Sequence, residues 1–340
     1  MTFSRELADR IVRDSFAHLL SLIGPKGRFV YAHKIDDTSA VSDGYNMLRH
    51  CGTLWFMLRA ANERDLPLSA TDTAALSRAV GYAGAKMARP DWLGGEPYAL
   101  VTKGMIKTGG IGLSLMMLLA WQELARRHPT LDPQLPAPLD KTIAGLGAYG
   151  MQQTDGTDFI HKRALSDGTP TAFRSDYYTG EVLLGLICAD MPKPLVGPLL
   201  RSLMASDYGI DIQSHWMAYA ACEGIERAFV EAEFGEKYLH RLIADIATNT
   251  DYRQRRASTP IACRTEALTR ILMLADRRTG TTTLSARTLD TARTEAVANL
   301  NLQLDWYRNG QFFKSDDDDK VQIDYIQHNA TAYLNWLALS

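Results

Sequence analysis

"TGEVLLGLICADMPKPLVGPLLRSLMAS", residues 179–206, predicts two consecutive helices of different character. The first, 179–190, is apolar on most sides, which is typical of a helix that is buried all round. The second, 194–206, repeats apolar residues at a period near 3.6 and keeps a polar face, which is typical of a covering helix. A buried helix followed directly by a covering helix is an αα-hairpin. We therefore searched the rest of the chain for the same alternation.

The alternation continues along the whole chain. The helices predicted to be buried are 45–62, 110–127, 179–190, 214–230, 260–275 and 323–338. The helices predicted to cover them are 4–23, 70–88, 139–152, 194–206, 235–249 and 286–308. Six such pairs predict an all-α fold, the (α/α)6 toroid, in which six inner helices are ringed by six outer helices. No linker or low-complexity break interrupts the pattern, so we expect residues 1–340 to form a single domain.

Three non-helical stretches separate some of these helices, at residues 27–44, 94–110 and 154–176. They are rich in Gly, Asp, Thr and aromatic residues, which predicts short β-hairpins or ordered loops. Each stretch leads into an inner helix. We therefore expect all three on the one rim of the toroid where inner helices begin, and we expect the functional site there. The four aspartates in "SDDDDK", residues 315–320, repel one another and predict a solvated loop.

Composition excludes several classes of function. The chain has 340 residues, of which 46% are hydrophobic, and a formal net charge of −2. That balance gives no electrostatic reason to expect a nucleic-acid partner. The longest apolar run, residues 111–121, is shorter than the roughly 18–20 residues that a membrane span requires.

The first 24 residues are charged and amphipathic and lack the apolar core of a signal peptide. We therefore expect a cytoplasmic protein by default, and a periplasmic or secreted one if an export segment has been removed. The four cysteines stand singly in apolar helical segments, without the paired spacing of a zinc site. We therefore expect buried thiols, no metal and no cofactor.

Polar and aromatic residues are concentrated where the predicted inner helices begin. Asp176, Tyr177, Tyr178 and Glu181 precede or open the helix 179–190, although one Ser, Thr or Asp would be enough to cap it. The starts of four other inner helices carry similar groups: Asp43, Tyr45, Arg49 and His50; His215 and Trp216; Arg264 and Glu266; Asp324, Tyr325 and His328. Ser214 and Thr179 are the expected N-caps of their helices. The remaining groups exceed what capping needs and favour a ligand site.

Twelve alternating helices with polar, aromatic inner-helix starts resemble the six-hairpin toroid enzymes, which include glycoside hydrolases, polysaccharide lyases and sugar epimerases. The resemblance covers the architecture of the whole chain and is not a motif match to one family. It implies a carbohydrate substrate, bound in a cleft over the inner-helix starts by carboxylates and aromatic rings.

The first and last inner helices also resemble each other, in residues 49–55 and 327–333. Each has an amide or cation, then His, a small residue, Thr and an aromatic. Because these helices are neighbours in a closed toroid, His50 and His328 are predicted to approach each other. The alternative, which the sequence leaves open, is that each imidazole is buried and hydrogen-bonded within the protein.

The leading functional hypothesis is a glycoside hydrolase. Hydrolysis of a glycosidic bond needs one carboxylic acid and one carboxylate, and we assign these roles to Glu181 and Asp324, with Asp176 and Glu266 in reserve. The residues expected to bind sugar are Tyr45, Arg49, His50, Tyr177, Tyr178, His215, Trp216, Arg264, Tyr325 and His328. One alternative is a lyase or epimerase acting on uronic acids, in which Tyr or His moves a proton and Arg49 or Arg264 binds the carboxylate. Another is a non-catalytic glycan-binding or assembly protein.

Overall fold

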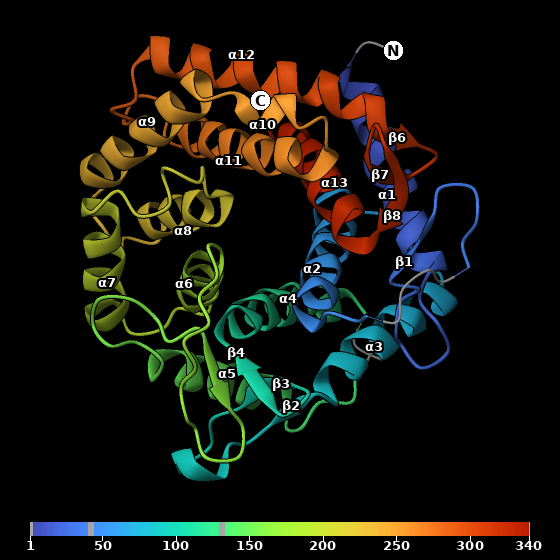
Figure 1. Cartoon of the computed structure of the whole chain (residues 1–340), viewed down its shortest axis with the longest axis vertical. Helices are drawn as coiled ribbons and strands as arrows, with labels where there is room; N and C mark the ends of the chain where they lie inside the picture. The colour runs from blue at the N-terminus through green and yellow to red at the C-terminus, as the bar shows by residue number, and fades with distance from the viewer. Residues whose placement is uncertain (1–2, 40–43, 129–132, 340) are drawn as a thin grey trace. The chain divides into compact units, whose positions relative to one another are not determined.

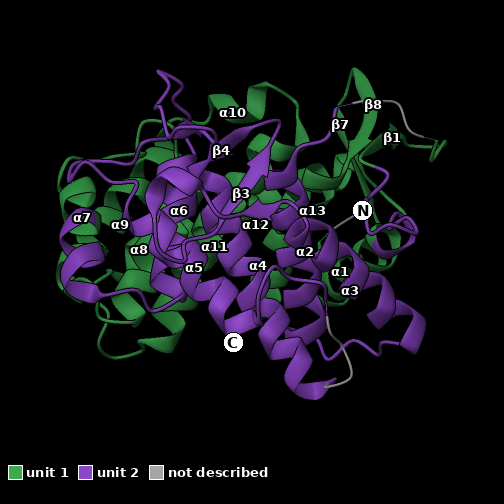
Figure 2. Cartoon of the chain, turned by 90° about the horizontal axis from the view of Figure 1, so that it is seen from below, with its two compact units in different colours: residues 1–19, 31–43, 200–340 green, residues 20–30, 44–199 purple. Residues whose placement is uncertain are grey.

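The computed structural model describes residues 3–39, 44–128 and 133–339. Asp43, proposed above beside Tyr45, lies outside these residues. The chain divides into two compact units (Figure 2). Among described residues, unit 1 contains 3–19, 31–39 and 200–339, and unit 2 contains 20–30, 44–128 and 133–199. The single domain expected from the sequence stays a prediction, and each unit is described by itself.

Unit 2 is built on three buried helices, α2 (Met47–Glu63), α4 (Thr108–Arg127) and α6 (Tyr178–Cys188). Their outer partners are α3 (Ala70–Gly84), α5 (Leu139–Met151) and the first part of α7 (Lys193–Ala205). α4 packs against both α2 and α6 (Figure 1). A Cβ on Gly112 of α4 would overlap the backbone carbonyl of Glu181, so glycine is required for this close approach of α4 and α6. The glycine-rich start of α4 therefore serves backbone packing.

Unit 2 also contains a four-stranded antiparallel sheet of order β2-β3-β4-β5. Its strands are β2 (Met87–Ala88), β3 (Ala99–Thr102), β4 (Met105–Lys107) and β5 (Lys162–Ala164). Lys103 and Gly104 join β3 to β4 with φ values of 51° and 70°, as a two-residue type I′ turn requires. The hairpin predicted in residues 94–110 is therefore confirmed. Residues 154–176 supply β5, and Lys107 stands directly opposite Lys162 in the β4–β5 register.

Unit 1 is built on α8 (His215–Glu226), α11 (Ser258–Arg277) and α13 (Ile323–Leu337). The surrounding helices are α1 (Arg5–Ser21, whose last two residues belong to unit 2), the second part of α7, α9 (Ala232–Thr248), the short α10 (Asp251–Gln254) and α12 (Ala286–Gln303). α11 packs against α8, α12 and α13 (Figure 1). Most residues of α8, α11 and α13 are buried, which agrees with their predicted inner character.

The sheet of unit 1 has the order β1-β8-β7-β6. Its strands are β1 (Ala32–Lys34), β6 (Tyr307–Arg308), β7 (Gln311–Ser315) and β8 (Asp318–Gln322). The loop predicted for 315–320 is wrong, because these residues form the turn and the flanking strand ends of the β7–β8 hairpin. Lys314 pairs with Asp318, Lys34 pairs with Asp319, and these cations offset the repulsion that argued against regular structure.

Each of the twelve predicted helices is present, and the differences lie at their ends. The helix predicted to reach residue 88 stops at Gly84, because Met87 joins β2. The helix predicted to reach residue 308 stops at Gln303, where a 3-10 turn (Leu304–Trp306) leads into β6. Ser214 caps α8 by accepting a hydrogen bond from the amide of Met217, as predicted. Among the described residues, no helix is long and apolar enough to cross a membrane.

Candidate functional site

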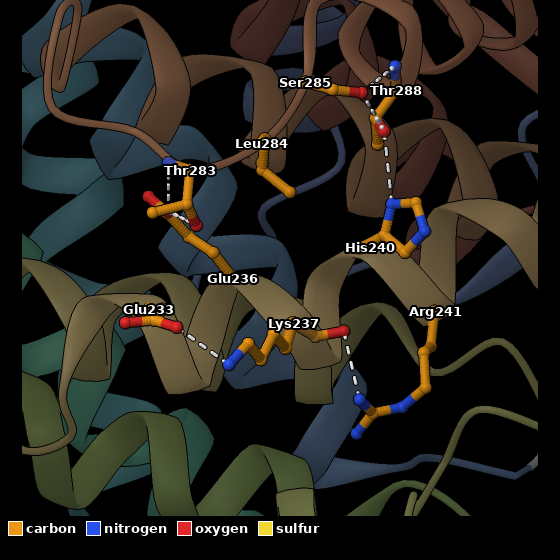
Figure 3. Close-up of a pocket in the computed structure, with 9 residues that line it drawn as sticks. All are labelled: Glu233, Glu236, Lys237, His240, Arg241, Thr283, Leu284, Ser285 and Thr288. Carbon is orange, nitrogen blue, oxygen red and sulfur yellow. Dashed lines mark hydrogen bonds and ion pairs between the residues drawn. The ribbon is translucent and has the colours of Figure 1, made fainter.

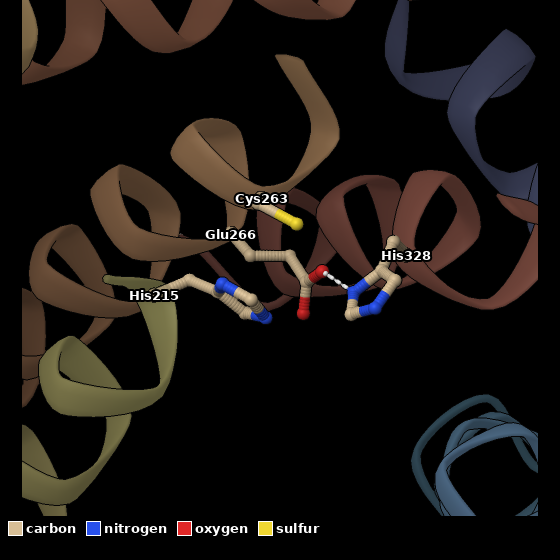
Figure 4. Close-up of side chains that lie close together, drawn as sticks. All are labelled: His215, Cys263, Glu266 and His328. Atoms are coloured by element: carbon tan, nitrogen blue, oxygen red, sulfur yellow. Dashed lines mark hydrogen bonds and ion pairs between the residues drawn. The ribbon is translucent and has the colours of Figure 1, made fainter. Parts of the chain in front are cut away.

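Four side chains of unit 1 that can carry or accept a proton lie together (Figure 4). They are His215 at the start of α8, Cys263 and Glu266 on α11, and His328 on α13. One N, O or S atom from each lies within 4.8 Å of the corresponding atoms of the other three. Cys263 and Glu266 share a face of α11 because they are three residues apart. Three of the four were predicted site residues, drawn from segments more than 40 residues apart in the chain.

His328 and Glu266 form a buried ion pair. Nδ1 of His328 lies 2.7 Å from Oε1 of Glu266, whose side chain is 0% exposed, whereas that of His328 is 13% exposed. Tyr219 donates its hydroxyl to Oε2 of Glu266 at 3.0 Å, and the amide of Asn335 donates to the Tyr219 oxygen at 2.7 Å. Both carboxylate oxygens are therefore held in place. The ring edge of His328 that carries Nε2 points away from Glu266 (Figure 4).

The two histidines differ in protonation. Burial alone would lower the pKa of His328, but the contacts of its ring with Cys263 and with the Glu266 carboxylate outweigh burial and raise that pKa well above the usual value. Burial, the charge of His328 and the charge of Arg264 together lower the pKa of His215 well below the usual value. The two rings meet edge to face with centroids 5.1 Å apart. Near neutral pH the site thus holds one imidazolium and one neutral imidazole, which is the pairing that general acid–base catalysis uses.

Trp216 lies against both histidine rings, whereas Arg264 bonds to the turn that precedes α8. The Trp216 ring lies 4.7 Å from the His215 ring and 6.1 Å from the His328 ring, and it is almost fully buried. Arg264 donates from Nε to the side chain of Gln213 at 2.8 Å and from a terminal nitrogen to the backbone carbonyl of Ile212 at 3.0 Å. Arg264 and Glu266 thus both have partners on elements other than α11, and Arg264 fixes the turn that leads into α8.

The carboxylates assigned to hydrolysis lie in separate units. Asp324 is in the first turn of α13 in unit 1, where Oδ1 accepts a 2.6 Å hydrogen bond from the side chain of Gln322. Glu181 is in α6 of unit 2, where its carboxylate packs against Gly109 at the start of α4. Their predicted role as an acid–base pair stays a prediction. Tyr325, also on α13, is partly exposed.

The polar and aromatic residues that precede or open α6 divide into exposed and buried ones. Asp176 and Tyr177 are exposed, whereas Tyr178 and Glu181 are buried. Burial raises the pKa of Tyr178, as does the nearby charge of Glu181. The predicted N-cap role of Thr179 is wrong: Tyr177 occupies that position.

The hydroxyl of Thr179 is instead engaged across unit 2. It donates to Oδ1 of Asp158 at 2.6 Å and lies 3.1 Å from Nε2 of His161. Because the amide of Ser175 donates to Nδ1 of His161, the proton of this imidazole is on Nε2. This network orders the segment that leads to α6.

His50 is buried and hydrogen-bonded within the protein, which is the alternative that the sequence left open for it. Tyr45 donates its hydroxyl to Nδ1 of His50 at 2.7 Å, and Nε2 donates to the carbonyl of Ala79 at 2.9 Å. The ring is fully buried, and burial lowers its pKa to about 4. Tyr45 also accepts from the amide of Phe29, and Arg49 on the same helix is exposed. His50 belongs to unit 2 and His328 to unit 1, so their predicted approach stays a prediction.

The sequence analysis missed Cys263, Tyr219 and Asn335. Tyr219 follows His215 by four residues and Cys263 precedes Glu266 by three, so helical spacing from a chosen residue could have found both. Nitrogen, sulfur and carboxylate oxygen are also donors that zinc accepts, although no metal was expected from the sequence. A zinc ion bound to both His328 and Glu266 would have to open their 2.7 Å contact, whereas a shared proton fits it as it stands.

A pocket of 370 Å³ lies elsewhere in unit 1, between α9 and the start of α12 (Figure 3). Two of the cations that line it are paired within the protein: Lys237 with Glu233 at 2.8 Å, and Arg241 with Asp207 at 2.6 Å. His240 lies 3.1 Å from the hydroxyl of Thr288. Because its charges are largely offset by these contacts, the pocket is a weaker candidate than the His215–His328 pair.

Comparison with family models gives no match, and comparison with characterised protein sequences gives none either. Two solved structures are similar over nearly the whole chain. A D-mannose isomerase aligns over 99% of this chain and 99% of its own, with a TM-score of 0.67 and 11% identity. An unsaturated glucuronyl hydrolase specific for heparin aligns over 98% and 96%, with a TM-score of 0.60 and 13% identity. These similarities confirm the predicted all-α, (α/α)6 toroid fold.

Proposed function

We propose that this protein is a carbohydrate-active enzyme that transfers a proton between carbon atoms of a sugar, as isomerases and epimerases do. The observation that carries the proposal is the pair of histidines in unit 1, one protonated and held by Glu266, the other neutral. Similarity to the fold of a D-mannose isomerase supports a sugar as the substrate. This proposal develops the epimerase alternative of the sequence analysis, in which Tyr or His moves the proton, and it assigns that role to His215 and His328.

The chemistry needs no group beyond the two imidazoles. In the open-chain form of an aldose, neutral His215 removes the proton from the carbon beside the carbonyl, while the His328 imidazolium donates a proton to the carbonyl oxygen. The product is an enediol, and each histidine has exchanged its protonation state. Return of a proton to the former carbonyl carbon, with loss of the neighbouring hydroxyl proton, gives the ketose and restores both histidines. If the enediol turns over in the site, His215 can return its proton to the opposite face of the original carbon while His328 takes back the proton from the former carbonyl oxygen, which gives the epimer and restores both histidines.

Glu266 has a positioning role in this scheme. A carboxylate that accepts from Nδ1 fixes the ring orientation and keeps the proton supply at Nε2. Tyr219 and Asn335 in turn hold the carboxylate. Because Glu266 is fully buried and ion-paired, it is poorly suited to act as the acid of a glycoside hydrolase, a role for which the sequence analysis held it in reserve.

A hydrolase remains the second candidate, and Glu181 is the observation that favours it. This side chain is buried beside Tyr178 in unit 2, and a glycoside hydrolase needs a carboxyl group as its acid. The heparin-specific glucuronyl hydrolase among the similar structures supports the same class. In this alternative Glu181 and Asp324 act as acid and base, with Asp176 nearby in sequence. The non-catalytic alternative, glycan binding alone, predicts no turnover of any kind.

Proton transfer is tested by solvent exchange. The protein is incubated in D2O with a panel of aldoses, ketoses and hexuronates, and loss of the C–H signal beside the carbonyl is followed by NMR. The wild type is expected to exchange that proton with at least one sugar. His328→Gln and His215→Gln should each reduce exchange by at least about 100-fold, the lower end of what general acid–base groups contribute. His240→Gln, an exposed histidine of the same unit, is the matched control and should leave exchange unchanged.

The same samples separate the alternatives. Release of new reducing ends from oligosaccharides, abolished by Glu181→Gln and kept by His328→Gln, would overturn the proposal in favour of hydrolysis. Ultraviolet absorbance from an unsaturated product would indicate a lyase.

A further inference from the structure

Strand pairing in unit 2 brings two positive charges together. Lys107 ends β4 and Lys162 begins β5, and the two are direct partners in the antiparallel register. Directly opposed residues have Cβ atoms about 4.5–5.5 Å apart on the same face of the sheet, and like charges there are destabilising. Both side chains are partly buried. In the described part of the chain, neither ammonium group is within ion-pair distance of a carboxylate.

A third cation adds to this field. Arg49 on α2 is close enough that it acts on Lys107 together with Lys162. Burial first, and then the charges of Lys162 and Arg49, lower the pKa of Lys107. The arrangement is therefore costly for the isolated protein and would be relieved by one bound anion. Lysines that served only solubility could stand at positions whose side chains lie on opposite faces of the sheet, where they would not repel each other.

Aromatic rings adjoin the same strands. The ammonium of Lys162 lies 5.6 Å from the centre of the Phe173 ring, and that ring lies 5.7 Å from the ring of Tyr178. Phe173 is 41% exposed. An exposed ring offers a stacking surface to the apolar face of a sugar. Ammonium groups beside it offer charge-assisted hydrogen bonds to an oxyanion.

We infer that unit 2 binds an anionic sugar, with Lys107 and Lys162 holding its oxyanion and Phe173 contacting its ring. The oxyanion is a carboxylate, as in a hexuronate, or a phosphate, as in a sugar phosphate. The inference does not depend on proton transfer by the histidines of unit 1. It gives the chain a class of ligand, acidic sugars, that the sequence analysis raised only through Arg49 and Arg264.

The test is a set of NMR binding titrations of the full chain with D-glucuronate, D-glucose 6-phosphate and D-glucose. At least one charged sugar should bind about tenfold or more tightly than D-glucose, since charge-assisted contacts of this kind contribute that much. The tighter of the two charged ligands identifies the source of the oxyanion. Equal affinity for all three sugars would overturn the inference.

Variants locate the site. Lys107→Gln and Lys162→Gln should each weaken the charged sugar about tenfold and leave D-glucose unchanged. Lys103→Gln is the matched control, because it removes the same charge from the exposed turn of the same sheet, and it should change affinity less than about twofold. An equal loss in Lys103→Gln would refute a local site. Phe173→Ala should weaken D-glucuronate or D-glucose 6-phosphate but not inorganic phosphate.

Two further readouts keep the outcomes separable. Removing either opposed lysine relieves repulsion, so neither variant should lower the thermal midpoint of unfolding, and lost binding then cannot be attributed to misfolding. Exchange of carbon-bound protons is measured separately, in neutral sugars and with the His215 and His328 variants, and Lys103→Gln should leave it unchanged. Failure of the binding test therefore leaves the proton-transfer proposal standing, and failure of exchange leaves the binding result intact.

Discussion

Replacing Glu266 by glutamine tests the ion pair of unit 1 without any knowledge of the substrate. Glutamine keeps the size of the side chain and can still accept from Tyr219, but it removes the negative charge that faces His328. Charge-assisted hydrogen bonds contribute about 1.5–3 kcal/mol, and breaking a buried pair costs about 3–5 kcal/mol. His328 is slightly exposed and can release its proton in the variant. We therefore expect a loss of about 2–3 kcal/mol in the free energy of unfolding near pH 6.

The loss should depend on pH in a defined direction. A histidine whose pKa is higher in the folded chain than in the unfolded chain stabilises the fold fully below the unfolded value of about 6.5. That stabilisation disappears as the pH rises through the folded value, which for His328 is well above 6.5. The difference between wild type and Glu266→Gln should therefore be largest near pH 6 and should shrink toward pH 9.

Urea unfolding followed by far-ultraviolet circular dichroism at the two pH values measures this difference. Glu233→Gln is the matched control: Glu233 pairs with Lys237 on the exposed face of α9, and such pairs contribute at most about 1 kcal/mol. His328→Gln should abolish the same pH dependence, and the double variant should show coupling between the two sites. An equal loss at pH 6 and pH 9, or no loss at either, would refute the ion pair.

Further predictions follow from the same contacts. Tyr219→Phe removes the hydrogen bond to Oε2 of Glu266 and should lower the proton-exchange rate about tenfold with little change in far-ultraviolet circular dichroism; an unchanged rate would show that Glu266 needs no such support. The exchange rate of the wild type should stay constant from about pH 7 to pH 6, because the lowered pKa keeps His215 unprotonated there; a rate that halves near pH 6.5 would contradict the assignment of His215 as base. Dialysis against EDTA should leave the exchange rate unchanged, and restoration of a lost rate by zinc would favour a metal centre at the same four donors. Gly112→Ala should destabilise the fold by about 1–3 kcal/mol through overpacking of α4 against α6, whereas Gly110→Ala, which faces movable leucine side chains, should cost less in thermal unfolding.

The helices were predictable because their signal is local. A period of 3.6 in apolar residues shows within any 11–18 residues, and the alternation between fully apolar and amphipathic segments separated inner from outer helices. Errors occurred where a partner distant in sequence decided the structure. Met87 pairs with Leu100 of β3, which ends α3 early. The aspartates of 316–319 form a hairpin because Lys34, Lys314 and Arg256 offset their charge.

The candidate site was predictable residue by residue but not as a constellation. His215, Glu266 and His328 were each selected because they stand near the starts of predicted inner helices, where capping needs fewer polar groups. The sequence could not show that Glu266 faces His328 rather than another polar residue of a neighbouring inner helix, because that choice depends on the rotation of α11 against α13. The i,i+2 spacing of Arg264 and Glu266 excluded only their mutual pairing. Thr179 shows the same limit, since its partners Asp158 and His161 lie about 20 residues away.

The excess of polar residues at the inner-helix starts therefore has two different explanations. At Tyr45 and His50 it is structural, because the two side chains bond to each other and to backbone atoms of Phe29 and Ala79. At the Glu266–His328 pair that explanation is insufficient, since an apolar pair of similar volume would be at least as stable as a buried ion pair. The same holds for Lys107 and Lys162, whose opposition costs stability. If the fold would be equally stable without a pair of polar groups, that pair is the better candidate for function. In this chain such pairs are the histidine pair of unit 1 and the lysine pair of unit 2.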